Sequence, residues 1–104
     1  MLEAEIFRAL SDPTRRAVYE RLAQNERSVG ELTGDFDVSQ PAISQHLAAL
    51  RAAGLVHERR DGRRALYRSN PEGLKPLLDW IDRYKDSWPD RIERLKTVLK
   101  EIDR

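Results

Sequence analysis

The chain has 104 residues, the length of one small domain, and its lack of cysteine excludes disulfides, thiolate metal sites and cysteine nucleophiles. Its formal net charge is only +1, but residues 55–70 hold five arginines against two acidic residues, so the positive excess is local. No stretch approaches the roughly 18 apolar residues that a membrane span needs, and no leader segment is visible, so we expect a cytoplasmic protein without a membrane partner.

Two helices are predicted at the start of the chain. The first covers about residues 2–10, where apolar residues are four positions apart: Leu2, Ile6 and Leu10. Such an amphipathic helix needs a partner surface. The second covers about residues 13–24, because Ser11-Asp12-Pro13 supplies a cap and a proline at the first helical position. Arg15 and Arg16 lie in its first turn, on the side where a DNA phosphate could lie, although both could equally be ordinary surface arginines.

A short third helix is predicted after a turn at residues 25–27. Ser28 and Glu31 match a capping box, in which each side chain bonds the backbone N–H of the other residue. Leu32 and Phe36 are four positions apart, so we expect them to be buried together.

The following helix, about residues 40–53, has two different faces and completes a helix-turn-helix over about residues 28–54. Ser39 can cap its start, and Gly54 can adopt the left-handed conformation that ends it. One face is apolar, with Ile43, Leu47 and Leu50. The opposite face carries small or hydrogen-bonding residues: Pro41, Ser44, Gln45 and Ala48. In a chain with 36% charged residues this face is unusual, and it suits close approach to base edges in the major groove of DNA.

A β-hairpin is predicted after this helix. Residues 55–60 and 63–68 alternate like strands, and Asp61-Gly62 between them favours a two-residue turn. The hairpin carries five arginines: Arg59, Arg60, Arg63, Arg64 and Arg68. Next to a base-recognising helix, such a hairpin is the wing of a winged helix, and its arginines can reach phosphates or the adjacent minor groove. An edge hairpin whose charges only prevent aggregation is the alternative.

Two further helices are predicted after the hairpin. Asn70-Pro71 opens a helix whose apolar residues recur at helical spacing: Leu74, Leu77, Leu78, Ile81 and Tyr84. Beyond it, apolar residues form a heptad seam: Trp88, Ile92, Leu95, Leu99 and Ile102. Pro89 would collide with the carbonyl of Lys85 in a continuous helix, so we expect a kink or break near residues 85–89. The seam needs a cover, which is either a second copy of the chain or the chain's own core.

Several of these segments together resemble the ArsR/SmtB family of bacterial winged-helix repressors. The resemblance covers about residues 6–68 and rests on the motifs at residues 9–16, 31–32, 38–47, 53–56 and 60–67, with Leu50. The expected fold is mainly α with a small β-hairpin, a winged helix-turn-helix. We expect one domain over residues 1–104, with the wing at about 55–69 and C-terminal dimerisation helices at about 71–103.

The resemblance implies a homodimer whose first and last helices form the interface, with two recognition helices in successive major grooves of a pseudo-palindromic operator. The dimer-interface candidates are Leu2, Ile6, Trp88, Ile92, Leu95, Leu99 and Ile102. The DNA-binding candidates are Ser39, Gln40, Pro41, Ser44, Gln45, His46, Arg15, Arg16, Arg59, Arg60, Arg63, Arg64 and Tyr67. Glutamine can bond adenine through two hydrogen bonds, and serine can bond either type of base. For His46, a half-buried packing role is the alternative to a phosphate contact.

The segments that bind metals in other members of this family differ here. Where thiolate-based members have Cys-x-Cys, this chain has Thr33-Gly34-Asp35, and its two histidines, His46 and His57, lie outside the late helices that hold zinc sites. One helical face carries a row of acidic residues: Asp79, Asp82 and Asp86. Such a row is far more often a solvated face paired with nearby cations than a metal site. We therefore expect no bound metal and no cofactor.

The residues and the resemblance together predict a sequence-specific, homodimeric transcriptional repressor that binds double-stranded DNA. Its inducer, if it has one, is not a thiophilic or transition metal. A winged helix that binds a protein is the alternative, disfavoured because Ser44, Gln45 and Ala48 offer no large apolar contact. No enzyme is expected, since neither histidine is arranged with a nucleophile and no glycine-rich phosphate loop occurs.

Overall fold

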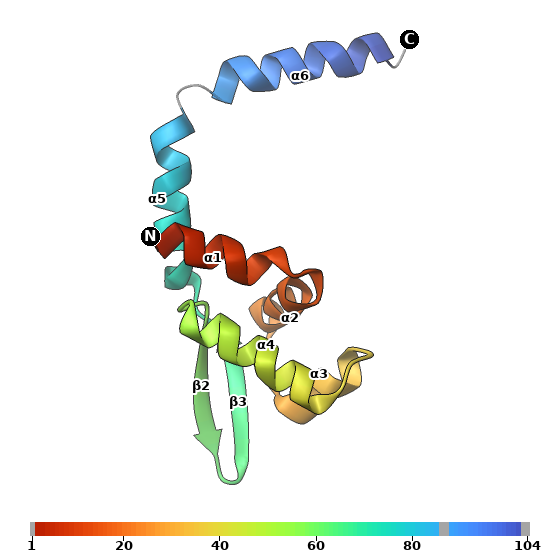
Figure 1. The fold of residues 1–104 in the computed structure, drawn as a ribbon, viewed down its shortest axis with the longest axis vertical. Helices are drawn as coiled ribbons and strands as arrows, with labels where there is room; N and C mark the ends of the chain where they lie inside the picture. The colour runs from red at the N-terminus through yellow and green to blue at the C-terminus, as the bar shows by residue number, and fades with distance from the viewer. Residues whose placement is uncertain (1, 86–87, 103–104) are drawn as a thin grey trace.

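The computed structural model describes residues 2–85 and 88–102, and in these ranges it confirms a mainly α fold with a small antiparallel sheet (Figure 1). The elements in chain order are α1 Leu2–Ser11, α2 Pro13–Gln24, β1 Arg27–Ser28, α3 Val29–Asp35, α4 Gln40–Ala52, β2 Val56–Asp61, β3 Arg64–Ser69, the 3-10 helix η1 Pro71–Leu74, α5 Lys75–Tyr84 and α6 Trp88–Ile102.

The starts of α2, α3 and α4 are set by the caps that the sequence predicts. The Asp12 side chain accepts from the backbone N–H of Arg15, at 2.9 Å. Ser28 and Glu31 form the capping box in both directions, with N–O distances of 3.1 and 3.0 Å. Ser39 accepts from the N–H of Ala42, at 3.3 Å, and so defines the start of α4. Each cap supplies a partner for a backbone donor that the first turn leaves free.

The sheet has three strands in the order β1-β3-β2, one more than the hairpin predicted from sequence. Asp61 pairs with Arg64 across the turn, where Gly62 has a φ of 63°. The turn expected at residues 25–27 ends one residue early, because Arg27 pairs with Tyr67 of β3 and begins β1. A strand of two residues has no alternating pattern by which sequence alone would predict it.

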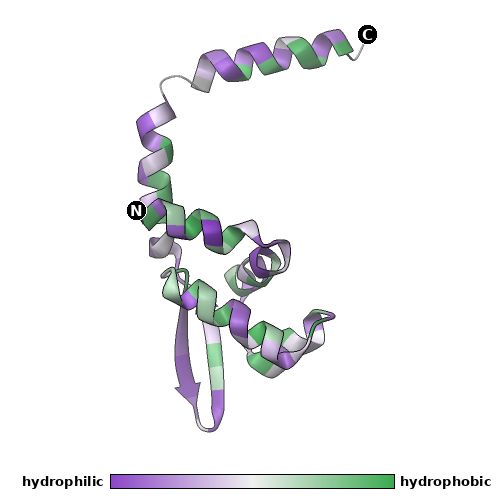
Figure 2. Ribbon diagram, in the orientation of Figure 1, coloured by the Kyte–Doolittle hydropathy of each residue, from purple (hydrophilic) through white to green (hydrophobic). Residues whose placement is uncertain are grey.

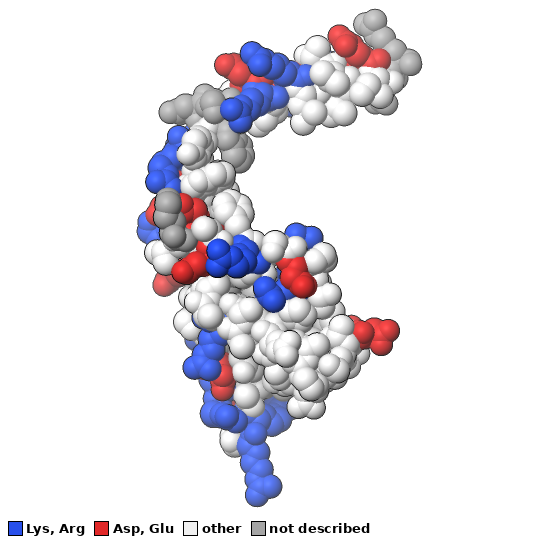
Figure 3. Space-filling view, viewed as in Figure 1, with Lys and Arg blue, Asp and Glu red and all other residues white. Residues whose placement is uncertain are grey.

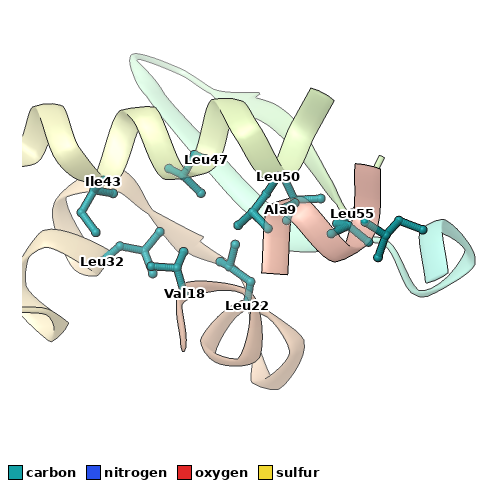
Figure 4. Packing of buried hydrophobic residues seen from close by; sticks show 10 residues of the cluster. Ala9, Val18, Leu22, Leu32, Ile43, Leu47, Leu50 and Leu55 are labelled. Atoms are coloured by element: carbon teal, nitrogen blue, oxygen red, sulfur yellow. The ribbon is translucent and has the colours of Figure 1, made fainter. Parts of the chain in front are cut away.

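The apolar core lies between the helix-turn-helix, α1, α2 and the base of the hairpin (Figure 4). Its buried residues are Ile6, Ala9, Val18, Leu22, Leu32, Ile43, Leu47, Leu50, Leu55 and Val56. The predicted apolar face of α4 is thus confirmed: Ile43 and Leu50 are fully buried and Leu47 is 1% exposed. Because all three lie on one stripe of α4, the opposite side of this helix is left at the surface.

The hairpin root and the start of the C-terminal region are joined by close backbone contacts. Gly54 ends α4 with a φ of 77°, as predicted. The Asn70 side chain does not cap the next helix; its Nδ2 donates to the carbonyl of Gly54 at 2.9 Å instead. Gly73 of η1 lies so close to Gly54 that a Cβ on Gly73 would overlap the Gly54 carbonyl.

The C-terminal helices leave the core in two steps (Figure 1). α5 packs along α1, where the rings of Phe7 and Trp80 meet edge to face with centroids 5.2 Å apart. α5 ends at Tyr84 and α6 begins at Trp88 in a different direction, and the expected interruption falls partly on residues 86–87, which lie outside the described residues. α6 then extends away from the core, so folding back on the chain's own core, the alternative cover for the seam, is not observed. None of the described helices is long and apolar enough to cross a membrane.

Candidate nucleic-acid interface

The outward side of α4 is exposed and made of the small side chains expected there. Ser44 and Gln45 are exposed, as are Gln40, Pro41 and Ala48. In residues 2–85 and 88–102, no hydrogen bond engages the side chains of Gln40, Ser44 or Gln45, so their donors and acceptors remain available to a ligand. Between Gln40 and Ala48 this face has no long charged side chain that would hold α4 away from base edges; Arg51, in the last turn, is exposed and paired with Glu58.

His46 lies beside this face and is held by Arg15 of α2. The Nε of Arg15 donates to Nδ1 of His46 at 3.3 Å, and Nη1 of the same arginine lies 3.4 Å from the carbonyl of Ala9. Arg16 in turn donates to the carbonyl of Leu10 at 3.2 Å. Both arginines therefore tie the start of α2 to the end of α1, and the half-buried His46 joins that contact.

The wing arginines fall into two groups. Arg59 forms a bidentate ion pair with Glu26, with N–O distances of 2.8 and 2.6 Å. The hydrogen bonds from Arg59 lower the pKa of Glu26, and the same pairing raises the pKa of Arg59. At the hairpin tip, Arg63 and Arg64 are exposed, and no ion pair engages either of them within the part of the chain that the structure describes. Figure 3 shows basic side chains, drawn in blue, gathered along the wing, where all of them are arginines.

A carboxylate on β2 connects α4 to the wing. Glu58 accepts from Nη1 of Arg51 at 2.7 Å and from the hydroxyl of Tyr67 at 3.0 Å, both through Oε2. The Nε of Arg60 lies 3.7 Å from Oε1. Partial burial raises the pKa of Tyr67, and its hydrogen bond to Glu58 adds to the shift. Sequence reasoning missed Arg51 and Glu58, since their pairing depends on how the hairpin folds back toward α4.

The apolar residues predicted for a dimer interface divide between surface and core. Leu2, Leu95, Leu99 and Ile102 are between 54 and 73% exposed, and Ile92 is 45% exposed. Ile6 is wrongly placed in that set: it is 1% exposed in the chain's own core. The side chain of Trp88 lies outside the described residues. Figure 2 shows apolar positions recurring along α6, where Val98 adds a further exposed residue that the heptad spacing did not select.

The acidic row of α5 is engaged by lysines. Asp79 pairs with Lys75 at 3.0 Å, and Asp82 pairs with Lys85 at 2.9 Å. Asp86 lies outside the described residues. Among the residues that were searched, no group of three or more His, Cys, Asp or Glu side chains is placed to hold a metal ion.

Comparisons with known proteins agree with this architecture. The family model "Bacterial regulatory protein, arsR family" matches residues 12–58, which run from the cap of α2 into β2. The transcriptional regulator Rv2034 of Mycobacterium tuberculosis is 49% identical over 78 residues, which are 75% of this chain and 73% of that protein. The transcriptional repressor SdpR of Bacillus subtilis is 33% identical over 76 residues, covering 73% of this chain and 84% of SdpR.

A solved structure is also similar over almost the whole chain. The ArsR-like transcriptional regulator from Rhodococcus sp. RHA1 superposes with a TM-score of 0.75 at 33% sequence identity. The match covers 93% of this chain and 92% of that one. The similarity thus extends beyond the helix-turn-helix into the segments at both ends of the chain.

Proposed function

The chain belongs to the ArsR family of bacterial regulatory proteins, and from that membership we propose how it recognises DNA. It is a DNA-binding transcriptional regulator of the repressor type. We propose that it acts as a homodimer on a pseudo-palindromic operator, with α4 in the major groove and the wing on flanking phosphates. The observation that carries this proposal is the exposed, uncharged and hydrogen-bonding face of α4.

In the proposed complex, Gln40, Ser44 and Gln45 contact base edges. Their side chains are exposed and make no hydrogen bond within the described residues, so binding a base breaks no existing contact. Pro41 has no N–H and contributes apolar contact only. Ser39 accepts from the N–H of Ala42 and keeps its own hydroxyl hydrogen to donate to a phosphate.

The phosphate contacts are assigned to the arginines at the end of the wing. Arg63 and Arg64 are exposed at the tip, and within the described residues Arg60 has only a 3.7 Å ion pair with Glu58, so all three guanidinium groups can turn toward DNA. Arg59 and Tyr67 are assigned to support of the wing, because each is already bonded to a carboxylate.

The remaining candidates are Arg15 and Arg16 at the start of α2, and His46 of α4, which Arg15 contacts. Arg15 and Arg16 bond carbonyls of α1 and so hold the start of α2 in place. We therefore assign both arginines to positioning α2 and not to contacting DNA. Arg15 bonds Nδ1 of His46 and not Nε2, so Nε2 can donate to a phosphate.

The exposed apolar stripe of α6 supports the homodimer. A single helix that leaves Leu95, Leu99 and Ile102 in water is unfavourable, and a second copy supplies an equivalent stripe by symmetry. Two recognition helices related by a two-fold axis then meet half-sites about 34–36 Å apart, one turn of DNA.

Selection of bound fragments from random DNA tests this function. The purified protein should enrich one motif with an inverted repeat whose half-sites are about one helical turn apart. Enrichment of a single half-site would contradict the dimeric operator but keep the role of α4. Absence of any enriched motif, with DNA bound equally at all sequences, would contradict base recognition by α4.

A further inference from the structure

Glu58 lies where the recognition helix and the two long strands of the wing meet. Its carboxylate joins Arg51, in the last turn of α4, to Tyr67 of β3 through the same oxygen. The Glu58 side chain is only 17% exposed, whereas that of Arg51 is 63% exposed. The carboxylate is therefore partly enclosed at the base of the wing, with a charged donor on one side and a hydroxyl donor on the other.

This contact is the polar side-chain link between α4 and the hairpin, in addition to the apolar core that both share. Across residues 2–85 and 88–102, the pair Arg51–Glu58 is the only side-chain hydrogen bond or ion pair that joins α4 to β2 or β3. On the next residue of β2, Arg59 is bound by Glu26, which precedes β1. Successive side chains of a strand point to opposite faces, so the two ion pairs hold the hairpin from both sides.

Because this contact lies some distance from the hairpin turn, a small change of angle at Glu58 displaces the wing tip. Gly62 lies four positions after Glu58, which corresponds to about 13 Å of extended strand. A rotation of about 15° at Glu58 would therefore move the tip by about 3 Å, as much as the whole length of an arginine–phosphate hydrogen bond.

We propose that Glu58 is a positioning residue for DNA binding: by holding Arg51 and Tyr67, it sets the angle between α4 and the wing at which Arg63 and Arg64 reach phosphate while α4 contacts bases. This inference rests on the DNA contacts proposed above. Glu58 itself touches no DNA in this arrangement, and its effect is exerted through the orientation of the hairpin.

Removing the charge of Glu58 distinguishes positioning from a purely electrostatic effect on DNA affinity. A carboxylate near DNA repels phosphate, and it also neutralises Arg51. If charge alone mattered, Glu58→Gln would bind DNA more tightly. Positioning predicts the opposite sign, because a wing that is no longer held loses its phosphate contacts.

The test measures the binding of a duplex carrying the selected motif at several salt concentrations. Glu58→Gln keeps the size of the side chain and an acceptor for Tyr67, but it removes the ion pair. Glu72→Gln is the matched control, because Glu72 is an exposed carboxylate with no ion pair in the described residues. Thermal unfolding of each variant reports whether it is folded, and Arg51→Gln provides a second way to break the pair at an exposed side chain.

We expect Glu58→Gln and Arg51→Gln each to weaken binding at least tenfold at low salt, with no further loss when they are combined. The slope of log K against log salt should fall in magnitude by about 2, the value for two lost phosphate contacts, while Glu72→Gln leaves both affinity and slope near those of the parent.

A double-mutant cycle separates this inference from the proposed function. Arg63→Ala with Arg64→Ala should reduce the salt slope by about 2 in the parent and leave it unchanged in Glu58→Gln. The positioning role is overturned if replacing Arg63 and Arg64 lowers the salt slope of Glu58→Gln as much as that of the parent. It is also overturned if Glu58→Gln binds DNA more tightly than the parent. If the tip variant leaves the slope of the parent unchanged, the wing contacts of the proposed function are wrong, and the inference falls with them.

Discussion

Arg15 of α2 donates its Nε–H to Nδ1 of His46 on α4, across 3.3 Å, although the two residues are 31 positions apart. Because Nδ1 accepts this hydrogen bond, the neutral imidazole carries its hydrogen on Nε2. The backbone N–H of Arg15 also bonds Asp12 and lowers the pKa of that carboxyl. One arginine thus connects the cap of α2, the end of α1 and the recognition helix.

Replacing Gln40 and Ser44 of α4 by alanine should remove base recognition without unfolding the protein. Both side chains are exposed and unbonded in the described part of the chain, so stability should change little. Each lost base contact should cost about 1–3 kcal/mol of specific binding free energy. Competition between the selected motif and a scrambled duplex measures this loss. Gln24→Ala, at an exposed glutamine of α2, should leave discrimination intact, and equal discrimination by the α4 double variant would contradict base contact at these positions.

Leu95→Glu in α6 should convert the proposed dimer into monomers. Leu95 is 57% exposed in the single chain, so the charge disturbs no internal packing, but it would be buried against a partner. Sedimentation should give half the mass of the parent, with an unchanged helix content by circular dichroism. Arg94→Glu, at the neighbouring exposed position, is the control and should remain dimeric. A monomeric parent would disprove the α6 interface directly.

Gly73→Ala should destabilise the fold, because the new Cβ would overlap the carbonyl of Gly54 at the root of the wing. Backbone must shift to relieve that overlap, at a cost of about 1–3 kcal/mol in the free energy of unfolding. Gly34→Ala in α3 meets nothing within 4 Å, and it should stabilise the helix by about 0.5–1 kcal/mol. Urea unfolding of both variants measures whether the free energy of unfolding falls for Gly73→Ala and rises for Gly34→Ala. Equal effects would mean that the close approach of η1 to Gly54 is relaxed in solution.

The free energy of unfolding should decrease in acid, because protonation of Glu31 weakens the cap at the start of α3. Its hydrogen bonds with Ser28 and the nearby Arg27 lower its pKa below the ordinary value of 4.5. A lowered folded-state pKa adds stability that is fully present above 4.5 and is lost as the pH falls through the folded-state value. Glu31→Gln keeps an acceptor for the Ser28 N–H, so unfolding measured from about pH 3 to about pH 7 should show a shallower acid slope than the parent. Identical slopes would show that the carboxylate charge contributes nothing.

Local signals in the sequence were sufficient for most helix starts and for the two faces of α4. Asp12, Ser28 and Ser39 each cap a helix within three residues of themselves, and Gly62 turns the hairpin on its own backbone. The spacing of Ile43, Leu47 and Leu50 sets which side of α4 is buried, and so which side is free for DNA. These effects depend on neighbours within about one helical turn, which is why a single sequence contains them.

Only the tertiary structure decided which charged and apolar side chains remain free. Glu26 binds Arg59 from 33 positions away, and Ile6, expected at a dimer interface, is buried in the core. The pairing of Glu58 with Arg51 likewise arises because the hairpin lies against α4. Helical periodicity reports that a residue belongs to an apolar stripe, but the choice between core and partner depends on how the whole chain packs. Likewise, an arginine's charge is visible in the sequence, whereas its carboxylate partner is brought to it by folding.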